Sequence, residues 1–150
     1  MINAIDSVSY AAAKKDIRRF LCGVNFRSKD GKVKICATDG HRLAERPLFN
    51  APVLSDFNVT LSNSIISLLL KQTKKASIEL VIYANGIVVI EYGSTKIVAD
   101  TGEMGRYPDV ERVKQPLQIA RQFMQIDKKE ALNATDLLLI NSKSKFAGAR

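Results

Sequence analysis

The chain has 150 residues, of which 46% are hydrophobic, and its formal net charge is +8. This size and composition predict one ordinary globular domain with a short appendage, and they exclude a disordered chain. Aliphatic runs reach only about four residues, far short of the roughly 20 that span a bilayer, and the N-terminus lacks the basic and apolar regions of a signal peptide. We therefore expect a soluble cytoplasmic protein with no membrane partner.

The first half of the chain predicts a helix followed by three strands. The spacing of Ile5, Val8 and Ala12 indicates a short helix within residues 2–13. Period-two alternation then indicates a hairpin, whose tight turn is Lys29-Asp30-Gly31. The three expected strands cover residues 20–26, 33–37 and 43–49.

The same order of elements follows. After a strand, Ser62 is expected to cap a helix whose apolar face runs from Ile65 to Leu70. Asn85-Gly86 then predicts a tight hairpin. The expected strands of this half cover residues 57–61, 78–84, 87–92 and 95–99. Beyond them we expect a loop over 101–116, a strand at 117–126, a helix at 128–139 and a stub at 145–150.

These elements predict an α+β fold. Two copies of a helix-plus-strands unit would pack both helices on one side of a continuous antiparallel sheet. The two units have the same order of elements, but their sequences show no residue-level repeat.

Positive charge is concentrated at the two ends of the chain. Residues 1–35 hold eight basic and three acidic side chains, and residues 114–150 hold seven and three, whereas residues 36–113 have a net charge of −1. Such a distribution suits a polyanion, most often nucleic acid, bound through its phosphates. Solubility alone explains the same pattern equally well.

The few metal-ligating side chains argue against a metal site. Cys22 and Cys36 lack CxxC spacing, and the chain has a single histidine, His41. We expect both thiols to be small buried hydrophobes and expect no metal or other cofactor.

The most distinctive stretch is Ala37-Thr38-Asp39-Gly40-His41-Arg42-Leu43-Ala44. A histidine beside an aspartate supports catalysis only with a nucleophile or a second acid–base group held in reach. The sequence identifies no such group, so we expect a protein that is not an enzyme and has no catalytic residues.

Three blocks resemble the middle domain of bacterial DNA polymerase III beta subunits, the beta sliding clamps. They are Asp16 to Val24, Ala37 to Ala44, and Gly105 to Val113, in the family's order and spacing. The tail from Leu137 is similar, more loosely, to the opening of the family's third domain. The resemblance implies a clamp-like domain over residues 1–113 and a partial third domain, of strand, helix and strand stub, over 114–150.

The resemblance also implies a function. Beta clamps are rings of two chains, each with three similar domains, whose helices surround duplex DNA and whose surface tethers polymerases and other replication proteins. We therefore expect a non-enzymatic processivity factor of DNA replication, from a phage or mobile element. Its expected partners are double-stranded DNA, bound without sequence preference, a DNA polymerase or other clamp-binding peptides, and a full-length clamp or a second copy of itself.

Two groups of residues match the family's functional positions. The resemblance implies a peptide-binding pocket made of Leu21, Thr38, Gly40, His41, Arg42, Leu43, Pro108, Arg112 and Val113. The apolar members suit the walls of such a pocket, and the arginines suit peptide carbonyls or a C-terminal carboxylate. The resemblance further implies DNA contacts by Lys14, Lys15, Arg18, Arg19 and Phe20. Each site has a structural alternative. The apolar residues of the pocket could simply fill the domain's core, and the basic residues could form a solvated turn without a DNA contact.

The chain also departs from the family's pattern. Ser62 and Asn63 stand where the second helix of a middle domain often begins with basic residues, and Glu111 adjoins Arg112. The strand expected before the first helix has no counterpart, so residues 117–126 are a candidate cover for an open sheet edge. An alternative function is a truncated interaction protein, which competes for clamp partners or pairs with a full-length clamp without encircling DNA.

Overall fold

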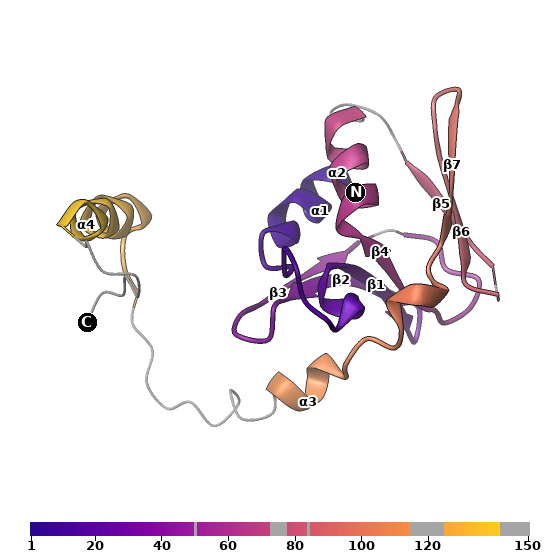
Figure 1. Ribbon diagram of the computed structural model, residues 1–150, viewed down its shortest axis with the longest axis horizontal. Helices are drawn as coiled ribbons and strands as arrows, with labels where there is room; N and C mark the ends of the chain where they lie inside the picture. The colour runs from indigo at the N-terminus through magenta and orange to yellow at the C-terminus, as the bar shows by residue number, and fades with distance from the viewer. Residues whose placement is uncertain (50, 73–77, 84, 115–124, 142–150) are drawn as a thin grey trace. The chain divides into compact units, whose positions relative to one another are not determined.

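The computed structural model describes residues 1–49, 51–72, 78–83, 85–114 and 125–141 (Figure 1). The chain divides into two compact units, Met1–Pro108 and Asp109–Arg150. No described helix is long and apolar enough to cross a membrane.

The first sheet of the larger unit has four antiparallel strands in the order β3-β2-β1-β4. These strands are β1 (Gly23–Lys29), β2 (Lys32–Thr38), β3 (Leu43–Leu48) and β4 (Asn58–Ser62). The turn between β1 and β2 is the expected one, with positive φ at Asp30 and Gly31. Asn25 of β1 faces Cys36 of β2 and Thr60 of β4 in the register. Alternation along the strands therefore places Val24 and Phe26 on the opposite face from these polar residues.

The second sheet has three antiparallel strands in the order β5-β6-β7. They are β5 (Glu79–Ile82), β6 (Ile87–Tyr92) and β7 (Thr95–Asp100). The hairpin expected at Asn85-Gly86 is present, with Gly86 at a φ of +83°. The described strands thus form two separate sheets where the sequence suggested a continuous one.

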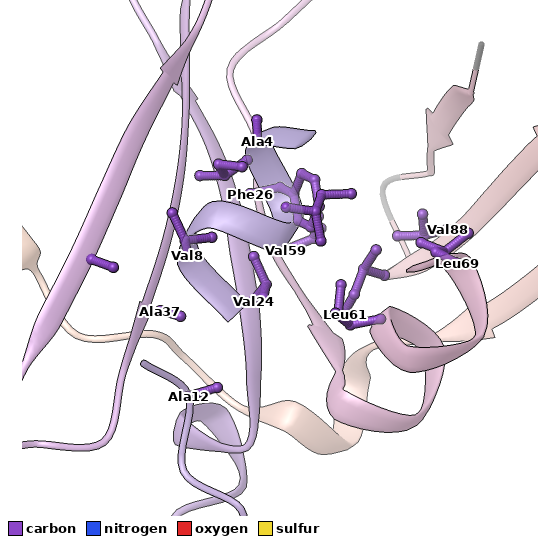
Figure 2. Packing of buried hydrophobic residues seen from close by; sticks show 14 of the residues in the cluster. Ala4, Val8, Ala12, Val24, Phe26, Ala37, Val59, Leu61, Leu69 and Val88 are labelled. Carbon is purple, nitrogen blue, oxygen red and sulfur yellow. The ribbon is translucent and has the colours of Figure 1, made fainter. Parts of the chain in front are cut away.

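Two helices lie side by side on the four-stranded sheet, α1 (Ile2–Ser9) and α2 (Asn63–Gln72) (Figure 1). Figure 2 shows Val8 of α1 near Val24 of β1, and Leu69 of α2 beside Val88 of β6. All four side chains are fully or almost fully buried. A single hydrophobic core therefore joins both helices to both sheets. The expected α+β class is confirmed.

Several element bounds differ from expectation in the first half of the chain. The first helix ends at Ser9, and a short 3₁₀ helix, η1 (Arg19–Leu21), replaces the start of the predicted strand. Buried alanines such as Ala11 and Ala12 continue the hydrophobic pattern beyond the helix, which explains the overprediction. Ser62 directly precedes α2 as predicted, but its hydroxyl bonds the hydroxyl of Ser64, 2.8 Å away.

The expected loop over 101–116 contains two helical turns, η2 (Gly102–Met104) and α3 (Val110–Lys114). In the smaller unit, α4 (Lys128–Asn141) agrees with the predicted helix. Aspartates begin both helices of this unit: Asp109 accepts the backbone N–H of Glu111, and Asp127 accepts those of Lys129 and Glu130. Most of the strand expected at 117–126 and the stub at 145–150 lie outside the described residues. The domain boundary expected at residue 113 stays a prediction.

Candidate interaction surface

The segment of residues 14–19, here called the basic loop, is closed at its base by backbone contacts. The N–H of Ala13 donates to the carbonyl of Leu21 at 2.9 Å. The side-chain amide of Asn63, at the start of α2, donates to the carbonyl of Ala13 at 2.7 Å, and its backbone N–H donates to Cys22. The loop therefore projects from a fixed base. Its exposed cations are Lys14, Lys15, Arg18 and Arg19.

The two arginines of the basic loop pair with carboxylates. Arg18 donates to both carboxylate oxygens of Asp16, at 3.1 and 3.0 Å, and its backbone N–H donates to the same group. These bonds lower the pKa of Asp16 to about 2. Arg19 pairs with Glu103. Lys14 and Lys15 are exposed, and neither forms an ion pair with a described residue, so they supply the loop's uncompensated charge.

Residues 38–42, here called the turn segment, are ordered by their own side chains. The Thr38 hydroxyl accepts the N–H of Gly40 at 3.0 Å and donates to the carbonyl of Arg42 at 2.6 Å. Asp39 accepts the N–H groups of His41 and Arg42, both at 3.0 Å. These two bonds lower the pKa of Asp39 below its ordinary value. Gly40 has a φ of +92°, which favours glycine.

The basic loop and the turn segment lie close together. The guanidinium of Arg18 lies 3.6 Å from the point that a Cβ at Gly40 would occupy. Arg42 forms an ion pair with Asp39, 3.0 Å between Nε and Oδ2, and its guanidinium lies over the ring of Tyr10. Residues far apart in the sequence thus form one surface at the end of α1.

The apolar residues of the expected pocket differ in exposure. Leu21 is buried, Leu43 is half-buried and Pro108 is exposed. Phe20 is half-buried and packs edge to face on Tyr107, with ring centroids 6.3 Å apart. Phe20 therefore contributes to packing, and its DNA contact stays a prediction.

Tyr107 itself is buried, and its hydroxyl has no hydrogen-bond partner of normal geometry. Burial raises the pKa of Tyr107 well above its ordinary value, and the nearby thiol of Cys36 adds to this effect. The tyrosine thus anchors the segment before Pro108 against the polar face of the first sheet.

The remaining pocket residues belong to the smaller unit. Arg112 lies in α3 and pairs with Asp109 at 3.5 Å. The side chain of Val113 lies outside the described part of the chain. Their contribution to the pocket stays a prediction.

Two residues of this surface were not identified from the sequence. Asn63 was interpreted only as the loss of a basic residue, and Tyr10 only as part of the first helix. Their partners, Ala13 and Arg42, lie 50 and 32 positions away, so no local pattern indicates them. Among the described residues, no group of three or more His, Cys, Asp or Glu side chains could hold a metal ion.

A family model described as the central domain of the DNA polymerase III beta subunit matches residues 1–109. The chain belongs to this beta subunit family. The beta sliding clamp of Salmonella typhimurium is 30% identical over 124 residues, which cover 75% of the chain and 31% of that relative. The beta sliding clamp of Proteus mirabilis is 28% identical over 160 residues, and this match covers 97% of the chain and 40% of that relative. The chain therefore spans well under half the length of these clamps.

Solved structures of the beta subunit family have the same fold. The DNA polymerase sliding clamp of Pseudomonas aeruginosa matches with a TM-score of 0.80 at 24% identity, over 97% of this chain and 40% of that one. The beta subunit of Thermotoga maritima matches with a TM-score of 0.58 at 28% identity, over 65% of this chain and 26% of that one. The resemblance inferred from three sequence blocks is confirmed.

Proposed function

We propose that the chain is a sliding-clamp-like scaffold of DNA replication. It would tether a DNA polymerase or another replication protein to duplex DNA through a peptide-binding pocket. The closeness of Arg18 in the basic loop to Gly40 in the turn segment supports this proposal most directly. A cationic segment and a short polar turn therefore lie side by side on one surface.

The peptide site would use the turn segment and its neighbours. Leu43 and Pro108 offer apolar contacts, and Thr38, His41 and Arg42 offer polar groups around them. Gly40 has no side chain, which leaves room for the backbone of a partner peptide. Leu21 is buried in the same unit as the turn segment. The inclusion of Arg112 and Val113, which belong to the smaller unit, stays a prediction from the sequence.

The DNA site would depend chiefly on Lys14 and Lys15. Asp16 and Glu103 offset part of the charge of Arg18 and Arg19, so the lysines are the stronger phosphate ligands. Contacts of this kind carry no sequence information, as a protein that slides requires. Their small number predicts weak binding and a shallow dependence on salt, because each neutralised phosphate contributes about −0.9 to the logarithmic slope.

A second candidate function is an interaction protein that binds clamp partners, or a full-length clamp, without DNA. One observation favours it: Arg18, Arg19 and Arg42 all pair with neighbouring carboxylates. The exposed face of α1 also presents Asn3, Asp6 and Ser7 and no lysine or arginine. Origin in a phage or mobile element and a cytoplasmic location stay predictions.

Two titrations on the intact chain separate these functions. A labelled DNA duplex should bind the native chain and the variant Lys29→Glu/Lys32→Glu, but not Lys14→Glu/Lys15→Glu. The two variants change charge equally, and Lys29 and Lys32 lie at the opposite end of β1 from the basic loop. Peptide binding with no DNA binding at low salt would establish the second function in place of the first.

The second titration uses a short labelled peptide with leucine side chains and a free C-terminus. The native chain should bind it, and Leu43→Asp should not, because the aspartate places a charge on the apolar wall. A matched peptide with aspartates in place of the leucines is the control. Equal binding of both peptides would contradict a specific pocket.

A further inference from the structure

Tyr10 is an exposed aromatic side chain that the core does not explain. It follows the last residue of α1, and 64% of its surface is exposed. The guanidinium carbon of Arg42 lies 5.8 Å from the centroid of its ring. This distance is within the range of a cation–π contact. The ring therefore covers one face of an arginine that belongs to the proposed pocket.

Arg42 is held from a second side by the turn segment. Its Nε lies 3.0 Å from Oδ2 of Asp39, and the other oxygen of Asp39 accepts two backbone N–H groups. This ion pair uses one of the five N–H donors of the guanidinium, and the other four are on the terminal nitrogens. The Arg42 side chain is 58% exposed, so these nitrogens remain accessible to a ligand.

We propose that Tyr10 is a positioning residue for peptide recognition, and this inference rests on the proposed peptide site. The ring and Asp39 together hold the fork of Arg42 in one orientation before a partner arrives. Preorganisation of this kind reduces the entropy lost on binding. Because Asp39 offsets the charge of Arg42, the Arg42 guanidinium suits the backbone carbonyl oxygens of an extended peptide. The peptide need not be acidic.

The test compares Tyr10→Leu with Tyr10→Phe in the intact chain. Both side chains are exposed at position 10, and leucine keeps an apolar body without the π face. With the labelled leucine peptide, Tyr10→Leu should weaken binding about two- to fivefold, the range of an exposed cation–π contact. Tyr10→Phe should restore binding to within about twofold. Arg42→Gln should weaken binding, and Tyr10→Leu should cause no further loss in the Arg42→Gln variant, because Tyr10 acts only through Arg42.

A second readout does not depend on peptide binding. The Nε–H resonance of Arg42 in an NMR spectrum should be shifted by the ring current in the native chain and in Tyr10→Phe, and not in Tyr10→Leu. A native chain that shows the ring-current shift but binds no peptide would refute the proposed site and, with it, the role of Tyr10. Peptide binding that is equal in all three chains would refute the role of Tyr10 alone. DNA affinity should be the same in all three chains, and a loss of DNA binding in parallel with peptide binding would refute a specific role of Tyr10 in peptide recognition.

Discussion

The side-chain amide of Asn63 donates a 2.7 Å hydrogen bond to the carbonyl oxygen of Ala13, which precedes the basic loop. A residue at the start of α2 thereby holds a segment that follows α1. In the sequence, Asn63 marks the loss of a basic residue from the second helix. In the structure it fixes the carbonyl of Ala13, directly before Lys14 and Lys15, so under the proposed function it would support DNA binding without contributing charge.

Replacement of Asn63 by alanine should loosen the basic loop. Loss of this partly buried hydrogen bond should lower the free energy of unfolding by about 1 kcal/mol. DNA affinity should fall as well, although the net charge is unchanged. Urea unfolding and DNA titration measure the two effects, with the exposed Asn3→Ala as the control. Unchanged DNA affinity in a measurably destabilised Asn63→Ala variant would show that the loop needs no such support.

Gly23 should not tolerate a side chain. A Cβ at this position would lie 2.3 Å from the carbonyl oxygen of Leu61 on the neighbouring strand. We expect Gly23→Ala to cost about 3 kcal/mol of stability, because the obstacle is backbone. Gly31→Ala is the matched control: it meets no atom within 4 Å and should cost only about 1–2 kcal/mol for its positive φ. Similar losses in thermal or urea unfolding of the two variants would contradict the close strand contact.

The Asp16–Arg18 pair predicts a loss of stability at acid pH. The folded state lowers the pKa of Asp16 from 3.8 to about 2, mainly through hydrogen bonds from Arg18. Its contribution is therefore complete above about pH 4 and disappears as the pH falls toward 2. Unfolding of the native chain and of Asp16→Asn, followed between pH 2 and 6, should show their difference shrinking over this window. A difference that grows with falling pH would have the wrong sign for a lowered pKa.

Tyr107→Phe should be neutral or stabilising by up to about 1 kcal/mol. The hydroxyl is buried without a normal hydrogen-bond partner, so its removal relieves a desolvation cost while the ring contact with Phe20 remains. Tyr92→Phe, at a half-buried position, provides the comparison. Destabilisation of Tyr107→Phe by more than about 1 kcal/mol would mean that the hydroxyl has a partner in solution.

Much of the fold could be predicted from local patterns. The helical spacing of Ile5 and Val8, and the turns at Asp30-Gly31 and Asn85-Gly86, indicated the helices and hairpins correctly. Division into two sheets could not be predicted, because strand pairing depends on contacts distant in the sequence. The sequence predicted too long a first helix, because Ala11 and Ala12 continue its apolar pattern. In the structure these alanines are buried, but they lie in turns after the helix.

The candidate site was predicted in part. The resemblance pointed to the basic loop and the turn segment, and Arg18 of the one lies close to Gly40 of the other. That these residues bind DNA or a peptide stays a prediction. The pairing of Arg18, Arg19 and Arg42 with carboxylates was not predicted, since charge counting treats each arginine as available. Only Asp16 and Asp39 are near their arginines in the sequence; Glu103 is 84 positions from Arg19.

The proposed function requires that one chain joins a peptide to DNA. Surface-immobilised duplex DNA, exposed at low salt to the labelled leucine peptide, tests it directly. The peptide should remain on the DNA only when the native chain is added, and neither Lys14→Glu/Lys15→Glu nor Leu43→Asp should retain it. Peptide and DNA that displace each other from the native chain, or a peptide that never reaches the DNA, would contradict the claim.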